Sequence, residues 1–224
     1  AIPYRDGYIF RVLAPNADEL YIKGDFTGWE SKRLIKNEEF GYFYGFFKAK
    51  LNDYYKYVVV KDGKWVEKTD PFAHAMDEEG DFAAKIIEDN YEFNDEDFLK
   101  NRDKCFNKPV NIYELHIGSF MRFKGDVNFL DIVDSLIRHV KDMNYTHVEI
   151  MPVTEYPYYP SWGYQSTGFF AISHRYGSAR DFKKFIDLLH QNGIGVILDV
   201  VAVHFASDFF GLDHFDGTAM YESQ

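Results

Sequence analysis

Short runs of strand-forming residues, each closed by turn residues, fill roughly the first 65 positions of the chain. They lie at 8–13, 20–26, 42–46 and 54–60, and the last is followed by the hairpin signal Lys61-Asp62-Gly63-Lys64. Several short strands at regular spacing predict an immunoglobulin-like β-sandwich. We expect a last strand near 83–87, and then an acidic, weakly periodic connector that ends at residue 105.

The periodicity changes near residue 110. Strand patterns at 110–118, 146–153 and 195–201 alternate with two helical patterns, which begin at about Asn128 and at Ser178. Asn128 with Asp131, and Ser178 with Asp181, have the spacing of capping boxes. The apolar positions of the two helices recur at three- and four-residue steps, at Phe129, Ile132, Val133, Leu136, Ile137 and Val140, and at Phe182, Phe185, Ile186 and Leu189.

The order β-α-β-α-β predicts parallel strands joined by right-handed crossovers. The chain therefore divides into residues 1–105, a β-sandwich with its connector, and residues 106–224, an α/β part with three parallel strands. Together these make a multidomain chain of the β plus α/β class.

The third strand pattern carries the first candidate for chemistry. Asp199 places a carboxylate in a run that is otherwise apolar, which is costly unless hydrogen-bond donors receive it. His204 follows where the strand should give way to a loop. Ligands bind at the C-terminal ends of such strands, so both residues are candidates. The alternative is an Asp bonded to backbone amides and a loop His without a role.

The loop at 161–170 is unusually aromatic for a segment expected to face water. Trp162, Tyr164 and Gln165 are candidates for substrate binding, with Tyr164 stacking on a pyranose ring. The alternative, equally compatible with the composition, is that the rings plug the rim of the sheet.

Composition narrows the class of ligand. The 224 residues include 22 Phe and 17 Tyr, and the formal net charge is −11. Such a charge argues against nucleic acid or an anionic membrane as partner and suits a neutral substrate.

No apolar run is long enough to span a bilayer, so a cytoplasmic location is expected. The lone Cys105 excludes an intrachain disulfide and a thiolate metal cluster.

Several other residues are weaker candidates. Trp29 could bind a glucan, but a Trp that caps the sandwich core is the favoured interpretation. His116 is expected to be a satisfied structural His. Glu149 and Glu155 are candidates for hydrogen bonding near the second strand. We expect no metal ligand among the remaining candidates, His147, His190 and His214. No cofactor is expected. No phosphate-binding loop or nucleophile elbow is present, so phosphoryl transfer and acyl transfer are poorly supported.

The segment from Asp199 to His204 resembles the first conserved region of the α-amylase superfamily, glycoside hydrolase family 13. Segments 162–171, 176–177 and 215–222, together with 112–119, resemble the 1,4-α-glucan branching enzymes of that superfamily. Segments 10–17, 24–29 and 70–73 resemble the carbohydrate-binding module of family 48. The resemblance implies a (β/α)8 TIM barrel after the sandwich, with its first three strands in this chain.

The resemblance also implies roles. Tyr164 matches the residue that stacks on the sugar in the −1 subsite. Asp199 matches the aspartate that supports this subsite, and His204 matches a histidine that hydrogen-bonds the same sugar. Many branching enzymes have Trp and Pro at the positions of Val200 and Ala202, and His at that of Tyr156. The nucleophile and the acid/base of the family come from later strands, beyond residue 224.

The expected function is therefore that of a branching enzyme, which cuts an α-1,4 glucan and transfers the segment to a 6-hydroxyl in glycogen biosynthesis. The chain by itself is expected to be catalytically incomplete. Its expected partners are α-1,4 glucan and the C-terminal remainder of the same enzyme. The alternatives are a debranching or trehalose-releasing hydrolase of the superfamily, or a glucan-binding protein without catalysis.

Overall fold

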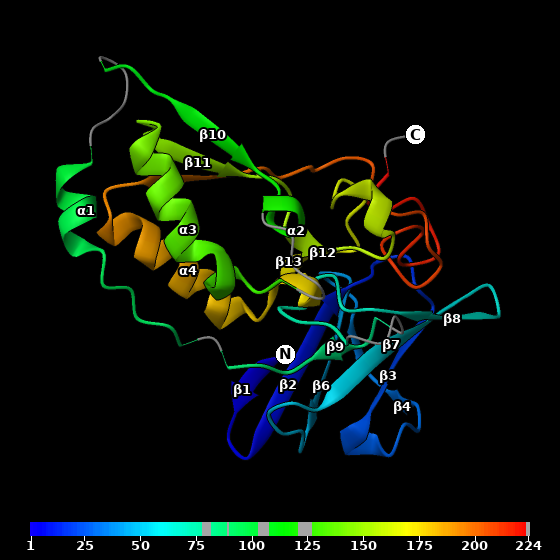
Figure 1. Ribbon diagram of the computed structural model, residues 1–224. Coiled ribbons are helices and arrows are strands. Elements are labelled where there is room, and N and C mark those ends of the chain that lie inside the picture. Colours follow the sequence, from blue (N-terminus) through cyan, green and yellow to red (C-terminus); the bar gives the residue numbers. More distant parts are fainter. Residues whose placement is uncertain (78–81, 89, 103–107, 121–126, 223–224) are drawn as a thin grey trace.

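A computed structural model describes residues 1–77, 82–88, 90–102, 108–120 and 127–222. Two antiparallel sheets form the N-terminal part, as the strand pattern predicts (Figure 1). The first sheet contains β1 (Ile2–Tyr4), β2 (Gly7–Leu13), β6 (Tyr42–Phe47) and β5 (Ile35–Asn37), in that spatial order. The second contains β4 (Lys32–Arg33), β3 (Glu19–Gly24), β7 (Tyr54–Lys61) and β8 (Lys64–Lys68), with β9 (Ala84–Lys85) also paired to β7.

The sandwich core lies between these sheets. Phe10, Leu20 and Tyr57 have no exposed surface there, because alternate residues of each strand point inward. Ala171 and Phe215, from the second half of the chain, belong to the same cluster of buried residues. The sandwich therefore packs directly against later segments of the chain.

Three parallel strands form the centre of the second half, as predicted: β10 (Ile112–Leu115), β11 (His147–Ile150) and β14 (Gly195–Leu198). Helices α3 (Phe129–Asp142) and α4 (Ala179–Gln191) cover one face of this sheet (Figure 1). Both predicted capping boxes, at Asn128 and Ser178, are present. Phe129 and Leu136 are fully buried, and each contributes about 1.5–3 kcal/mol by leaving water.

Further elements lie outside the predicted pattern. A small antiparallel pair, β12 (Thr154–Glu155) and β13 (Gly168–Ile172), flanks the loop expected at 161–170, and β13 includes its last residues. The connector contains α1 (Glu96–Asn101), and β10 is followed by the short α2 (Ile117–Phe120). In the described ranges there are also three 3-10 turns: η1 (Asp25–Thr27), η2 (Tyr159–Ser161) and η3 (His174–Tyr176).

The connector packs along α4. Buried Asp187 accepts hydrogen bonds from the Tyr91 hydroxyl at 2.7 Å and from the Asn94 backbone at 3.0 Å. His190 contacts Asp95 at 2.6 Å through Nδ1. The expected division at residue 105 and Cys105 itself lie outside the described residues. No helix in the described ranges is both long enough and apolar enough to cross a membrane.

Candidate functional site

Asp199 lies directly after β14, at the C-terminal end of the parallel sheet. Its backbone N–H donates to the Ile150 carbonyl at 3.0 Å, which holds this residue in line with the strand. Side chains alternate between faces, so Asp199 follows Ile197 onto the face opposite α3 and α4. In the parallel register Ile197 lies beside Glu149, which lies beside Glu114. This uncovered face therefore carries a carboxylate on β10, one on β11 and one directly after β14.

Tyr164 reaches this face from the aromatic loop. Its hydroxyl donates a hydrogen bond to Asp199 Oδ2 at 3.0 Å. Burial raises the pKa of the Tyr164 phenol, and the bond to Asp199 and the charges of Glu114 and Glu149 raise it further. The phenol thus stays protonated and acts as a fixed donor that orients the Asp199 carboxylate.

The loop is held in place by local geometry. Gly163 adopts a φ of +85°, and a side chain there would meet the Pro152 carbonyl oxygen at 2.5 Å. The Ser166 hydroxyl donates to the Gly163 carbonyl at 3.1 Å and lies 2.6 Å from the Thr154 hydroxyl. Tyr164 is therefore presented by a tight turn anchored to β12.

The other predicted binding residues surround this pair less closely. Trp162 is half exposed and packs against the His116 ring, with centroids 5.1 Å apart. Gln165 and His204 are exposed, and His204 has a φ of +61°. The structure brings Tyr164 and Asp199 together. Among the described contacts, neither Gln165 nor His204 forms a hydrogen bond with either of them.

His116 differs from the expectation of a satisfied structural histidine. Its Nδ1 lies 2.9 Å from the Ser119 hydroxyl, but its buried Nε2 has no hydrogen-bond partner among the described residues. Burial lowers the pKa of the imidazole, which keeps the ring neutral near pH 7. A neutral ring is a suitable support for the indole of Trp162.

Glu155 forms hydrogen bonds, as expected, but inside the protein. Its carboxylate has no exposed surface and accepts from the backbone and Nδ1 of His174, both at 2.9 Å, and from Arg175 at 3.2 Å. A buried carboxylate with several donors ties the β12–β13 pair to η3. Its role is structural support behind the aromatic loop.

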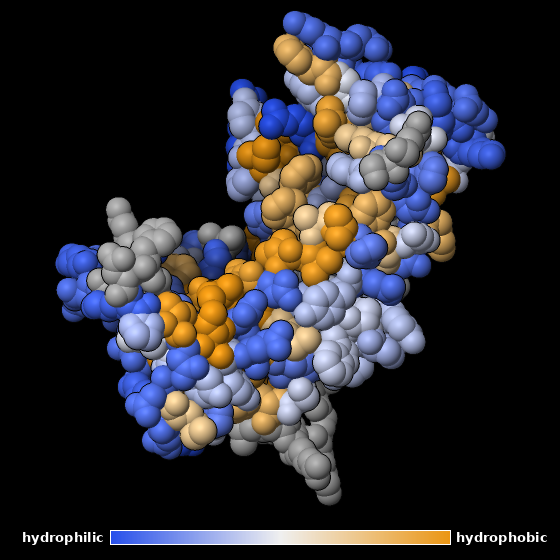
Figure 2. All heavy atoms as spheres, turned by 90° about the horizontal axis from the view of Figure 1, so that it is seen from above, coloured by the Kyte–Doolittle hydropathy of each residue, from blue (hydrophilic) through white to orange (hydrophobic). Residues whose placement is uncertain are grey.

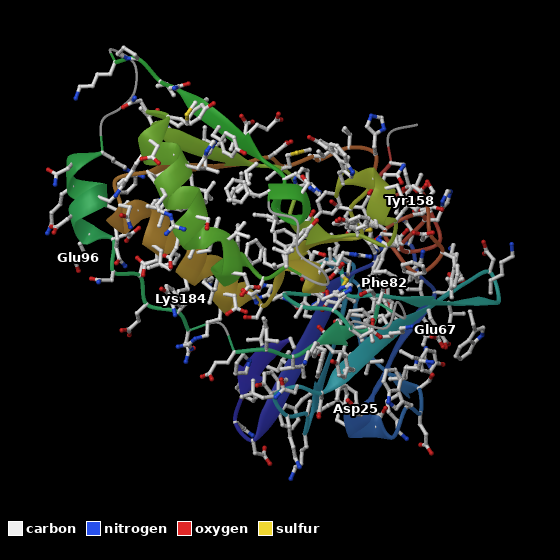
Figure 3. The ribbon with its side chains drawn as sticks, in the orientation of Figure 1. Asp25, Glu67, Phe82, Glu96, Tyr158 and Lys184 are labelled. Carbon is white, nitrogen blue, oxygen red and sulfur yellow. The ribbon has the colours of Figure 1, made fainter. Side chains whose placement is uncertain are left out.

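Trp29 does not cap the sandwich core, so that interpretation was wrong. Its side chain is 40% exposed, and its indole N–H donates to Asp25 at 2.9 Å. Trp65, which sequence reasoning missed, is 57% exposed and stacks on Tyr21 with centroids 4.8 Å apart. We call Trp29, Trp65 and Tyr21 the tryptophan platform. Figure 3 shows Asp25 and Glu67, from η1 and β8, in the sandwich part that carries it.

Asp213, His214 and Glu222 form a group that their separation along the chain did not suggest. One ligand atom from each lies within 4.8 Å of the others. His214 Nδ1 is 2.7 Å from Asp213 Oδ1 and 3.3 Å from Glu222 Oε1, and the Asp–His contact holds the pKa of Asp213 below its usual range. These contacts describe a cluster of two carboxylates around a histidine.

Two family models match the chain. Residues 1–73 match carbohydrate-binding module 48, the isoamylase N-terminal domain, and residues 119–218 match the catalytic domain of α-amylase. The 1,4-α-glucan branching enzyme of Aquifex aeolicus is 41% identical over 95% of this chain, and that of Rhodopirellula baltica is 40% identical over 96%. The chain spans 35% and 31% of the lengths of these two relatives.

Solved structures share the fold. A pullulanase from Anoxybacillus, complexed with maltotetraose, has a TM-score of 0.71 at 21% identity. A type I pullulanase from Bacillus subtilis, complexed with maltose, has a TM-score of 0.71 at 24% identity. Each match covers 91% of this chain and about a third of the solved one.

Proposed function

Because the chain belongs to the α-amylase superfamily and carries a family 48 carbohydrate-binding module, we propose that its protein is a 1,4-α-glucan branching enzyme. The observation that carries this proposal is the identity of about 40% to curated branching enzymes along nearly the whole chain. The pullulanases, which share the fold, are only 21–24% identical. The hydrolase alternative is therefore less well supported.

In this proposal, Tyr164 and Asp199 bind the sugar next to the scissile bond. The Tyr164 ring offers a face for the apolar side of a pyranose, and its hydroxyl keeps the Asp199 carboxylate turned toward the uncovered face. Asp199 can then accept a hydrogen bond from a sugar hydroxyl. Trp162, Gln165 and His204 would form the outer part of the same subsite.

Retaining transfer also needs a nucleophile and an acid/base about 5–5.5 Å apart. The proposal assigns these two groups to the strands that follow the third one in the family, and not to Asp199. The fragment of glucan would be held covalently and passed to a 6-hydroxyl. An aromatic rim of the kind formed by Trp162 would favour this transfer by limiting the access of water.

We further propose that α-glucan binds the tryptophan platform. Exposed aromatic rings on a rigid sheet stack on sugar faces at low entropic cost. Lys23, whose Nζ lies 5.8 Å from the Trp29 ring centroid, can add a hydrogen bond to a hydroxyl. A cytoplasmic location belongs to the same proposal and is supported by the single cysteine of the chain.

The test uses the protein as its gene encodes it, incubated with amylose. A branching enzyme lowers the iodine absorbance and creates α-1,6 linkages without a matching rise in reducing ends. A hydrolase would raise reducing ends, and a binding protein would change neither quantity. Asp199→Asn is the matched control, and it should remove the activity while leaving the fold intact.

A further inference from the structure

A row of aromatic rings lies on the sheet opposite the tryptophan platform. On β6, Tyr42, Tyr44 and Phe46 face outward, while Phe43 between them is buried in the core. Phe40 extends the row at one end, with its ring centroid 6.5 Å from that of Tyr42. We call Phe40, Tyr42, Tyr44 and Phe46 the aromatic row. Its rings are on one strand and its preceding turn, so they stand in line.

Strand β2 adds a donor beside this row. Arg11 lies opposite Tyr44 in the antiparallel register, and its guanidinium carbon is 5.5 Å from the Tyr42 ring centroid. An arginine carries five N–H donors in a fixed plane. The row therefore combines apolar ring faces, two phenol hydroxyls and a guanidinium, which is a mixed surface and not a purely apolar one.

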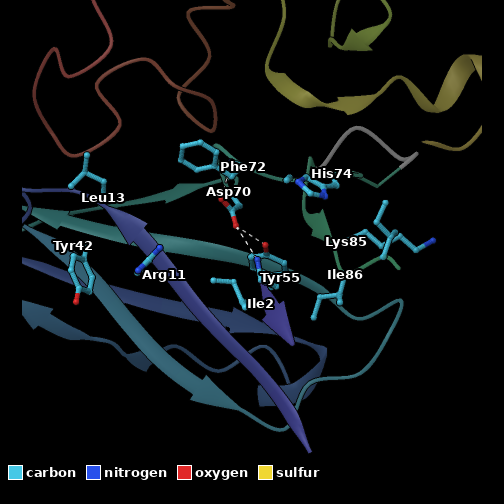
Figure 4. A pocket seen from close by; sticks show the side chains of 13 residues that line it. Ile2, Arg11, Leu13, Tyr42, Tyr55, Asp70, Phe72, His74, Lys85 and Ile86 are labelled. Carbon is cyan, nitrogen blue, oxygen red and sulfur yellow. Dashed lines mark hydrogen bonds and ion pairs between the residues drawn. The ribbon is translucent and has the colours of Figure 1, made fainter. Parts of the chain in front are cut away.

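One end of the row opens into a cavity of about 530 Å³. Arg11, Leu13 and Tyr42 line it from the sheet, and Asp70, Phe72 and His74 line it from the segment that leaves β8 (Figure 4). Phe72 stacks on Phe170 of β13, with ring centroids 5.2 Å apart. The cavity thus lies where the sandwich meets the second half of the chain, a preferred place for ligand sites.

A buried carboxylate forms part of the cavity wall. Asp70 is only 2% exposed and accepts hydrogen bonds from the Tyr55 hydroxyl at 2.6 Å, the Tyr57 hydroxyl at 3.5 Å and the Phe72 backbone at 2.9 Å. The amino group of Ala1 lies 4.0 Å from its Oδ2. A carboxylate offers about four acceptor sites and three donors occupy Asp70, so one site remains for a further donor. With Arg11 as donor and Asp70 as acceptor, the cavity matches hydroxyl groups, which both donate and accept.

We propose that the cavity and the aromatic row together form a second α-glucan site, separate from the tryptophan platform. The cavity takes the end of a glucan chain, and the row takes the sugars that follow. The continuity between them favours a linear polymer over a compact ligand. The lining holds cations, Arg11 and Lys85, beside the carboxylate of Asp70, and the neutral hydroxyls of the row favour an uncharged ligand. This inference rests on the proposed function for the identity of the sugar.

The experiment measures binding of maltoheptaose and glycogen to the 224-residue chain by calorimetry and by affinity electrophoresis. Trp29→Ala with Trp65→Ala removes the tryptophan platform and should leave measurable binding. Adding Tyr44→Ser with Arg11→Ala should then weaken it by about tenfold or more, as expected for loss of a stacked ring and its hydrogen bonds. Phe93→Ser, an exposed aromatic of the connector, is the matched control and should have no effect.

Equal binding with and without Tyr44→Ser and Arg11→Ala would overturn the inference. A change in self-association alone, measured by light scattering, would also overturn it and assign the row to a second copy of the chain. Failure of the proposed function is separate, because it is read from new α-1,6 linkages made by the protein as its gene encodes it. Glucan binding that depends on Tyr44, in a protein that forms no such linkages, would support the site and reject the enzyme.

Discussion

The sandwich and the parallel sheet bury their strands in different ways. In the sandwich, each sheet covers the inner face of the other, and residues such as Phe10 and Tyr57 have no exposed surface. In the second half, α3 and α4 cover one face of β10, β11 and β14, while Glu114, Glu149 and Ile197 occupy the other. Parallel sheets are normally covered on both faces. The candidate site lies on the face that these elements leave uncovered.

Both regions have edge strands, and in the described part of the sandwich β5 and β8 each pair on one side only. Within the described residues, β10 and β14 each pair on one side only. Leu198 is 45% exposed and Val200, just after β14, is 63% exposed. Figure 2 shows hydrophobic residues gathered in a band across the face seen from above. The comparison teaches that the inner faces of the sandwich are covered, in part by Ala171 and Phe215 of the second half, whereas the parallel sheet keeps one face that α3 and α4 do not cover.

The largest expected effect follows from the uncovered face. The 224-residue chain alone should show no branching of amylose, because the proposed function makes Asp199 a support for the sugar and assigns the nucleophile to a later strand. Iodine absorbance and α-1,6 linkages should both stay at the level of a blank. New α-1,6 linkages would mean that the catalytic pair lies within this chain, with Glu114 and Glu149 as the first residues to test.

A core substitution tests whether the two regions are independent. Phe129→Ala, which truncates a fully buried ring of α3, should destabilise the second half by about 3–5 kcal/mol. Hydrogen exchange followed by mass spectrometry should then show faster exchange in β10, β11 and β14, with β2, β6 and β7 still protected. Phe10→Ala in the sandwich is the matched control and should give the opposite pattern. Loss of protection in both regions together would show one cooperative unit.

Tyr164→Phe tests the hydrogen bond that joins the aromatic loop to β14. The ring is kept, but the donor to Asp199 is lost, which is worth about 1.5–3 kcal/mol for a charged acceptor. In the protein as its gene encodes it, kcat should fall about tenfold or more, with a smaller change in KM. An unchanged kcat would show that Asp199 does not depend on this donor.

The smallest expected effect concerns the connector. Burial, followed by the bond to Asp187, raises the pKa of Tyr91 to about 12, whereas the ordinary value is 10.0. The contribution of Tyr91 to stability is therefore fully present below pH 10 and is lost as the pH rises from about 10 to 12. Tyr91→Phe should cost about 1 kcal/mol at pH 8 and less at pH 12. Thermal unfolding at both pH values measures this, and a pH-independent difference would contradict it.

Local sequence signals predicted much of the fold. The capping residues at Asn128 and Ser178 and the apolar steps from Phe129 to Val140 predict both long helices, because a helix repeats every 3.6 residues and its first turn needs acceptors. The Tyr164 and Asp199 pair was expected from resemblance to a family, and the structure supplies the 3.0 Å bond between them. The β12–β13 pair and α1 were not expected, since short elements carry too few residues to show a period.

The sequence by itself determined the order of strands and helices, the parallel direction of β10, β11 and β14, and the residue types available to a sugar site. These follow from periodicity and chemistry, which act locally along the chain. Tertiary structure alone decided that Trp29 is exposed, that Glu155 is enclosed by His174 and Arg175, and that Phe72 meets Phe170. Each of these depends on which segments, distant in sequence, approach within a few ångströms, because burial and hydrogen bonding are set by the neighbours that packing provides.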